Sequence, residues 1–233
     1  MCDFCTIYNS HVLSQLCAGV LSTDDPTGAA QRAALGPFVA KQQPSAFEYL
    51  NRSGCVAIDG VDDLAEYHEM HDALSVLGFT PDAQREVLAI LTAILQLGCV
   101  RFVESSGGGG DAGGAGGGGG GDAGGDGSAL DESTRASFSV AAALLGLAEG
   151  KLLEALTFRI ETMGAGRGSV VAIRLSVAKA EETREALAKA LYGRMFDWLV
   201  RGVNESLGKA SNDASHQILS LHSEASLSHA RHF

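Results

Sequence analysis

The chain has 233 residues, of which 45% are hydrophobic, so it is long and apolar enough to bury a core in one or two domains. It carries 28 Asp and Glu against 17 Lys and Arg, a net charge of −11. This balance argues against a general nucleic-acid binder, because such proteins need a basic surface for phosphates. No segment reaches the ~18–20 consecutive apolar residues of a membrane span, so we expect neither nucleic acid nor a membrane among the partners.

The N-terminal segment MCDFCTIYNS has no positively charged region followed by a long apolar run, so we expect no signal peptide. The five cysteines are odd in number and scattered along the chain. Without export, they are most simply reduced thiols, which favours a cytoplasmic protein.

The first part of the chain predicts two helices joined by a linker-like connection. Residues 10–21 predict a short helix, and residues 22–45 are rich in Pro, Gly and Ala. Residues 61–79 predict a longer helix that stops at Gly78. Its apolar face is formed by Leu64, Tyr67, His71, Leu74 and Leu77.

A further helix is predicted immediately afterwards, over residues 80–98. Thr80 is a good N-cap, and Pro81 suits the first helical position. The segment CVRFVE that follows predicts a short extended stretch. The buried face of this helix is expected to contain Val87, Leu88, Leu91, Ile94 and Leu95.

Residues 105–128 hold half of the thirty glycines and no apolar residue larger than Ala. Such a segment buries too little apolar surface to offset the entropy of ordering its backbone. We therefore expect a mobile loop here.

The C-terminal half predicts helices around a hairpin. Helical patterns run from about Ser133 to residue 147 and over residues 149–158. Residues 158–175 contain two β-prone runs around a Gly-rich tip, which predicts a β-hairpin. Residues 185–204 form a helix that is apolar on nearly every side, so we expect it to run through the middle of a larger body. After Leu207 the pattern fades.

No motif supplies a complete catalytic or metal site. Cys2 and Cys5 lack a second ligand pair, and His68 and His71 lack the i, i+4 spacing of a metalloprotease helix. The segment GVNESLGKAS resembles a phosphate loop but has five residues between its glycines and Ala210 after Lys209. We predict no catalytic residue, no metal and no cofactor for this chain alone.

Three blocks resemble the myosin motor head. EYLNRSGCVAIDGVDDLAEYHEMHDALSVLGFTPDAQREVLAILTAILQLGCVRF is similar to its Y-L-N-x-S-G-C, D-G-V-D-D, L-G-F and I-L-A-A-I-L-H-L-G-N-V-x-F series. REALAKALYGRMFDWLVRGVNESL is similar to R-D-A-L-A-K-A-L-Y-x-R-L-F-D-W-L-V-x-x-I-N-x-S-L, and HVLSQLCAG to H-I-F-Y-Q-L-L-A-G. All three occur in myosin order. Departures are modest and are Gln96 for His, Cys99 for Asn, Glu185 for Asp and Val203 for Ile.

The resemblance implies a mainly α fold with a small β-hairpin, forming much of the upper subdomain that flanks the actin cleft. Residues 11–207 would be a partial motor domain; residues 1–10 and 208–233 do not match it, which favours a partial or mis-joined gene model over a genuine truncated protein. The phosphate loop and both switch motifs are not found. The complete head would use ATP and Mg²⁺, with actin filaments and the rest of the head as partners, in the cytoplasm and cytoskeleton.

Two functions from different classes remain open at this point. The first is a fragment of an actin-based, ATP-driven motor. The second is a non-enzymatic actin-binding or scaffold protein derived from a motor head. Transcript sequence across both ends would separate them, because continuation into the two switch motifs supports the motor and a real stop after Phe233 supports the scaffold.

The resemblance also places two loops towards actin: the glycine tract 105–128 and the hairpin 158–175. In the hairpin the candidate actin-facing residues are Arg159, Arg167, Ser169 and Arg174. Myosins carry an acidic or phosphorylatable residue sixteen positions before the residue that is Glu185 here, and that position is Ser169. Arg167 lies two residues earlier, as basophilic kinases prefer. The resemblance therefore implies phosphorylation of Ser169; the alternative is an ordinary turn serine.

Overall fold

The computed structural model describes residues 11–21, 35, 44–51, 59–105, 127–163 and 169–210. This part of the chain is mainly α-helical with two small antiparallel sheets, as predicted. The elements in order are α2 (His11–Leu16), a π-helical turn (Cys17–Leu21), a 3-10 turn (Pro44–Ala46), α4 (Glu48–Asn51), α5 (Asp63–Val76), α6 (Pro81–Gly98), β1 (Phe102–Glu104), β2 (Ser128–Leu130), a 3-10 turn (Glu132–Thr134), α7 (Arg135–Leu144), α8 (Glu149–Thr157), β3 (Phe158–Met163), β4 (Ser169–Arg174) and α9 (Val177–Ala210).

The corner between α5 and α6 forms as its residues predict. The carboxylate of Asp62 accepts hydrogen bonds from the first backbone N–H groups of α5. Gly78 has a φ of 82°, a left-handed conformation that favours glycine and ends the helix. The hydroxyl of Thr80 then accepts the N–H of Ala83 at 3.2 Å and starts α6 at Pro81.

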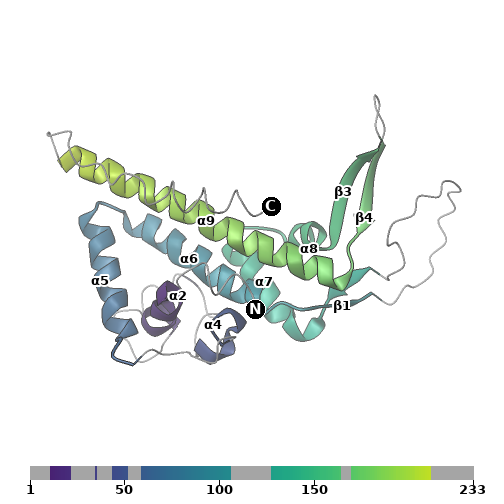
Figure 1. The fold of residues 1–233 in the computed structure, drawn as a ribbon, viewed down its shortest axis with the longest axis horizontal. Helices are drawn as coiled ribbons and strands as arrows, with labels where there is room; N and C mark the ends of the chain where they lie inside the picture. The colour runs from purple at the N-terminus through teal and green to yellow at the C-terminus, as the bar shows by residue number, and fades with distance from the viewer. Residues whose placement is uncertain are drawn as a thin grey trace, which may run out of the picture.

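Helix α6 lies at the centre of the body (Figure 1). Its predicted apolar face is buried, and burial goes further, since every residue from 91 to 98 is buried. This happens because α2 and α4 pack on one side of α6 while α7 and α9 pack on others. By contrast, the predicted apolar face of α5 is only partly buried, and Tyr67 is its one fully buried residue.

Two hydrophobic clusters form the core. The first joins α2, α4, α5 and α6 to Ala188 and Met195 of α9. The second joins β1 and β2 to α7 and α8, and it includes Ala180 near the start of α9. Helix α9 therefore spans both clusters and holds them in one body.

Residues 185–204 are helical, as predicted, and the described part of the chain covers this helix on only one side. Helix α9 starts earlier, at Val177, and lies along one side of the body (Figure 1). Ala188 and Met195 are buried, but Phe196 and Trp198 are 44% and 40% exposed. The physical reason is that the described helices cover only one side of α9.

The glycine loop predicted over residues 105–128 is shorter at both ends, because residues there belong to or adjoin a small sheet. Strand β2 begins at Ser128, which pairs with Glu104 of β1. Next to this pair, the N–H of Ser105 donates to the carbonyl of Gly127 at 2.6 Å. Both ends of the tract are thus tied together, and residues 106–126 lie outside the described residues.

None of the described helices is by itself long and apolar enough to cross a membrane. The segments Glu132–Leu144 and Glu149–Thr157 reach the required length and composition only when taken together, across a bend of 109°.

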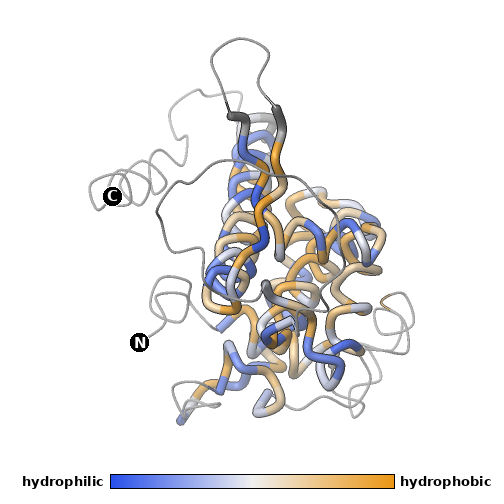
Figure 2. The backbone as a smooth tube through the Cα atoms, turned by 90° about the vertical axis from the view of Figure 1, so that its right-hand side faces the viewer, coloured by the Kyte–Doolittle hydropathy of each residue, from blue (hydrophilic) through white to orange (hydrophobic). Residues whose placement is uncertain are grey.

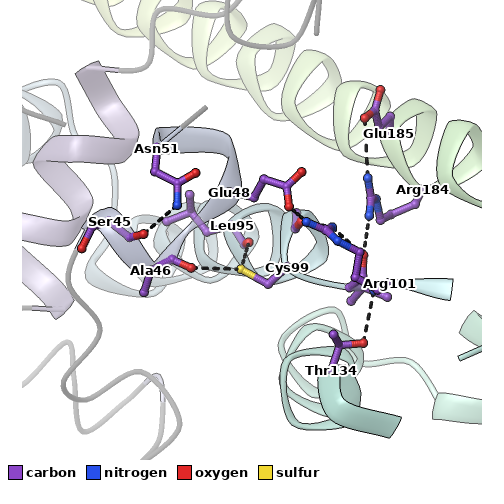
Figure 3. Close-up of polar contacts among 12 residues, drawn as sticks. Ser45, Ala46, Glu48, Asn51, Leu95, Cys99, Arg101, Thr134, Arg184 and Glu185 are labelled. Atoms are coloured by element: carbon purple, nitrogen blue, oxygen red, sulfur yellow. Dashed lines mark hydrogen bonds and ion pairs between the residues drawn. The ribbon is translucent and has the colours of Figure 1, made fainter. Parts of the chain in front are cut away.

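A polar junction fixes α9 to the end of α6 (Figure 3). Arg184 of α9 is 1% exposed, and its guanidinium donates to the carbonyl of Val100. Arg184 also lies 3.5 Å from the carboxylate of Glu185. Its Nε has no hydrogen-bond partner among the described residues, so this buried cation is only partly satisfied.

Arg101 extends the junction to α4 and α7. Its guanidinium pairs with the carboxylate of Glu48 and donates to the carbonyls of Gly98 and Val100. Its backbone N–H donates to the hydroxyl of Thr134 at 3.2 Å. Burial, and then the nearby charge of Arg184, lower the pKa of Arg101. The junction therefore ties four helices to one short segment, residues 98–101.

We predict that Arg184 stabilises the fold more than any exposed arginine on the same helix. Arg184→Ala should lower the free energy of unfolding by about 2–4 kcal/mol, because it removes a buried side chain and a charge-assisted hydrogen bond. Arg184→Met should cost less, since it refills the space and removes the unpartnered Nε. Urea unfolding followed by circular dichroism measures both, with exposed Arg194→Ala as the matched control. Equal stability of the Arg184→Ala and Arg194→Ala variants would show that the junction is not important.

Candidate functional site

The two strands β3 and β4 form an antiparallel hairpin that projects beyond the helical body (Figure 1, Figure 2). The register runs from Phe158 opposite Arg174 at the root to Met163 opposite Ser169. The predicted hairpin over residues 158–175 is confirmed in its two strands. Its tip, residues 164–168, lies outside the described residues, and Arg167 lies there with it.

The root of the hairpin has almost no linker. Phe158 follows the last residue of α8 directly, and only Leu175 and Ser176 separate β4 from α9. The N–H of Leu175 donates to the carbonyl of Thr157 at 2.8 Å, and the N–H of Ser128 donates to the carbonyl of Leu175 at 2.9 Å. These bonds attach the hairpin to α8 and to β2 at once.

The candidate arginines do not form one cluster. Successive side chains of a strand point to opposite faces, so Arg159 lies on one face of the hairpin and Arg174, opposite Phe158, on the other. Arg159 is exposed and forms an ion pair with Glu161 at 2.7 Å. The guanidinium carbon of Arg174 lies 5.4 Å from the centre of the Phe158 ring, a cation–π contact. Ser169 is the first residue of β4, at the end of the strand pairing that is farthest from the root.

The sequence analysis did not predict that apolar side chains of the hairpin are exposed. Ile160 is 68% exposed and Val171 is 38% exposed, one on each face. The signal that could have found them is the run VVAI at residues 170–173, because consecutive apolar residues in a strand place apolar side chains on both of its faces. A two-stranded sheet that leaves the body must show some of its apolar residues to solvent or to a partner.

The segment that resembles a phosphate loop has the wrong conformation for that role. Residues 202–210 lie inside α9, so their backbone N–H groups belong to a continuous helix and do not form a phosphate-binding nest. Within the described residues, no three His, Cys, Asp or Glu side chains gather closely enough to hold a metal ion. The hairpin is therefore the most distinctive candidate surface in this part of the chain.

Comparisons with known proteins identify the family. The sequence model of the family described as Myosin head (motor domain) matches residues 11–221. Myosin-1 from Aspergillus terreus is 38% identical over 168 residues, which is 71% of this chain and 12% of that protein. Myosin heavy chain IB from Acanthamoeba castellanii is 35% identical, and Myosin ID heavy chain from Dictyostelium discoideum is 34% identical, each over 176 residues. These two alignments cover 74% of the chain and 13% and 14% of the relatives.

The chain thus spans about an eighth of the length of these relatives, and the match to the family continues past Leu207. The three blocks, their order and the helices they form agree with that match. This chain belongs to the myosin head (motor domain) family.

Proposed function

We propose that this chain contributes a filament-binding surface to an actin-based, ATP-driven motor, and that the β3–β4 hairpin is that surface. Membership of the myosin head family supports the motor. The observation that supports this surface is a hairpin that leaves the body with a linker of only two residues, on the α9 side, and presents Arg159 and Ile160 to solvent. Because it spans a small part of its relatives, the chain would act together with the rest of a motor head.

The charge of the hairpin supports a partner with an acidic surface. Segment 158–175 contains three arginines and a single acidic residue, Glu161, whereas the whole chain has a net charge of −11. A locally basic projection on an acidic protein favours encounter with an acidic surface and orients that encounter. Such a surface on actin filaments would place the protein with the cytoplasmic actin cytoskeleton.

The family implies a nucleotide-dependent motor, but the described residues do not fit ATP and Mg²⁺. Gly202 and the residues after it are helical, and Lys209 is followed by Ala210 in place of the hydroxyl that would bind magnesium. We therefore assign no step of ATP hydrolysis to these residues.

We predict that the full chain does not bind nucleotide by itself. A fluorescent ATP analogue with Mg²⁺ should show no saturable binding at micromolar concentrations, because the segment that resembles a phosphate loop is helical and its backbone N–H groups are not available for the phosphates. A complete myosin head serves as the positive control. Saturable binding that requires Mg²⁺ and is lost in Lys209→Ala would contradict this expectation.

We predict that Arg159 contributes to filament binding. Arg159→Ala should weaken co-sedimentation of the full chain with actin filaments by about two- to fivefold, the range of an exposed ion pair. Glu161→Gln should strengthen binding, because it frees Arg159 from its ion pair. The matched control is Lys151→Ala on α8, an exposed cation that is also ion-paired, to Glu154.

The dependence on salt separates a direct contact from a change in structure. A direct contact requires the effect of Arg159→Ala to shrink as ionic strength rises. If wild type does not sediment with filaments, or if Lys151→Ala weakens binding as much as Arg159→Ala, the hairpin is not the surface.

We predict that phosphorylation of Ser169 strengthens actin-activated turnover of the complete head several-fold. Phosphate adds about −1.5 to −2 charges at neutral pH and strong acceptor oxygens, which can pair with a basic group of the filament. Ser169 lies at the far end of the strand pairing and Arg159 next to the root, so this basic group would be separate from the acidic surface expected opposite Arg159. Ser169→Ala should remove this gain and Ser169→Glu should retain part of it, while ATP hydrolysis without actin stays unchanged. The measurement is actin-activated ATPase before and after kinase treatment, with kinase-treated Ser169→Ala as the control. Equal rates for all forms at low salt would make Ser169 an ordinary turn residue.

A further inference from the structure

We propose that Arg174 is a positioning residue, which sets the orientation of the β3–β4 hairpin by packing its aliphatic stem against Gly127. The consequence for actin binding rests on the proposed function. The orientation itself does not, because it is a property of the free chain.

The contact leaves no room for a side chain on Gly127. A Cβ atom built on Gly127 would lie 2.7 Å from Cδ, 3.0 Å from Cβ and 3.3 Å from Cγ of Arg174. Carbon atoms at optimal contact are about 3.5–4.0 Å apart, so even a methyl group would push the arginine away. The backbone of Gly127 is not left-handed, and glycine is needed here for space alone.

Gly127 belongs to the fixed part of the molecule. Its carbonyl accepts the N–H of Ser105, and the next residue, Ser128, is buried and pairs in β2. Phe102 of β1 and Leu130 of β2 both lie in the second hydrophobic cluster. The surface that Arg174 meets is therefore anchored in the core.

Arg174 belongs to the projecting part. It is the last residue of β4, and it stands opposite Phe158, the first residue of β3, with its guanidinium over the Phe158 ring. One side chain thus contacts β3 through its head and the body through its stem. A two-stranded hairpin has little stability of its own, so contacts at the root decide which way it points.

This geometry allows a positioning role of Arg174 to be distinguished from a direct contact between Arg174 and the filament. Arg174 lies at the root and on the face opposite Arg159, so its stem and not its charge is the important feature. Arg174→Met keeps most of the stem and removes the charge. Arg174→Ala removes both.

The test measures the orientation of the hairpin without actin. Spin labels are carried on ketone-bearing amino acids at the exposed positions Ile160 on β3 and Ala136 on α7, which leaves the five cysteines untouched. Electron-electron resonance then gives the distribution of distances between hairpin and body. We expect a single narrow distribution for wild type and for Arg174→Met, and a shifted or broadened one for Gly127→Ala and Arg174→Ala.

The double variant tests whether the two residues act through each other. Adding Gly127→Ala to Arg174→Ala should change the distribution much less than Gly127→Ala changes wild type, because Cδ, the closest atom, and Cγ are gone and only Cβ remains, at 3.0 Å. An unchanged distribution in Gly127→Ala, or equal effects of Gly127→Ala in both backgrounds, overturns the proposal.

Co-sedimentation of the unlabelled variants with actin filaments forms the second arm. Gly127→Ala should weaken binding by about tenfold, or ~1.4 kcal/mol, and Arg174→Met should weaken it far less. If Arg174→Met loses as much binding as Arg174→Ala while keeping the wild-type distances, Arg174 is a charge contact and the positioning role is wrong. If the distances behave as expected and wild type binds no filaments, the proposed function fails and the positioning role stands.

Discussion

The contact between the buried guanidinium of Arg184 and the carbonyl of Val100 is the constraint on which the rest of the structure depends. It lies where α6 ends and β1 begins, so it fixes α9 against the most buried helix of the body. Arg101 binds the same carbonyl and reaches α4 through Glu48. Burying a charge whose Nε has no partner among the described residues is costly, so the stability of the junction depends on the bonds that the rest of the guanidinium makes.

The position of the hairpin follows from that of α9. Two residues connect β4 to α9 and none connects α8 to β3, so the strands start from two helices whose packing is already set. The bond from Ser128 to Leu175 adds the β1–β2 sheet as a third support. A projecting element held in this way can transmit force between a partner and the body, which is what the proposed role in a motor requires.

Local signals in the sequence are sufficient to predict the helices whose first and last residues are capping, proline or glycine residues. Thr80, Pro81 and Gly78 define the α5–α6 corner, and the periodicity of α6 identifies its buried face. The start of α9 was missed because residues 177–184 are largely polar, although Ser176 accepts the N–H groups that begin the helix. The burial of Arg184 and the opposite faces of Arg159 and Arg174 depend on contacts between distant segments and on strand register, which no local pattern records. The exposed Phe196 and Trp198 lie on the side of α9 that the described helices leave uncovered.

The most direct test of the account is hydrogen–deuterium exchange of the full chain with and without actin filaments. Filaments should protect backbone amides of β3 and β4, while α5, at the other end of the body from the hairpin, keeps the same exchange rates (Figure 1). Protection confined to α5, or no change in β3 and β4 at filament concentrations that sediment the chain, would contradict the assignment of the hairpin as the filament-binding surface.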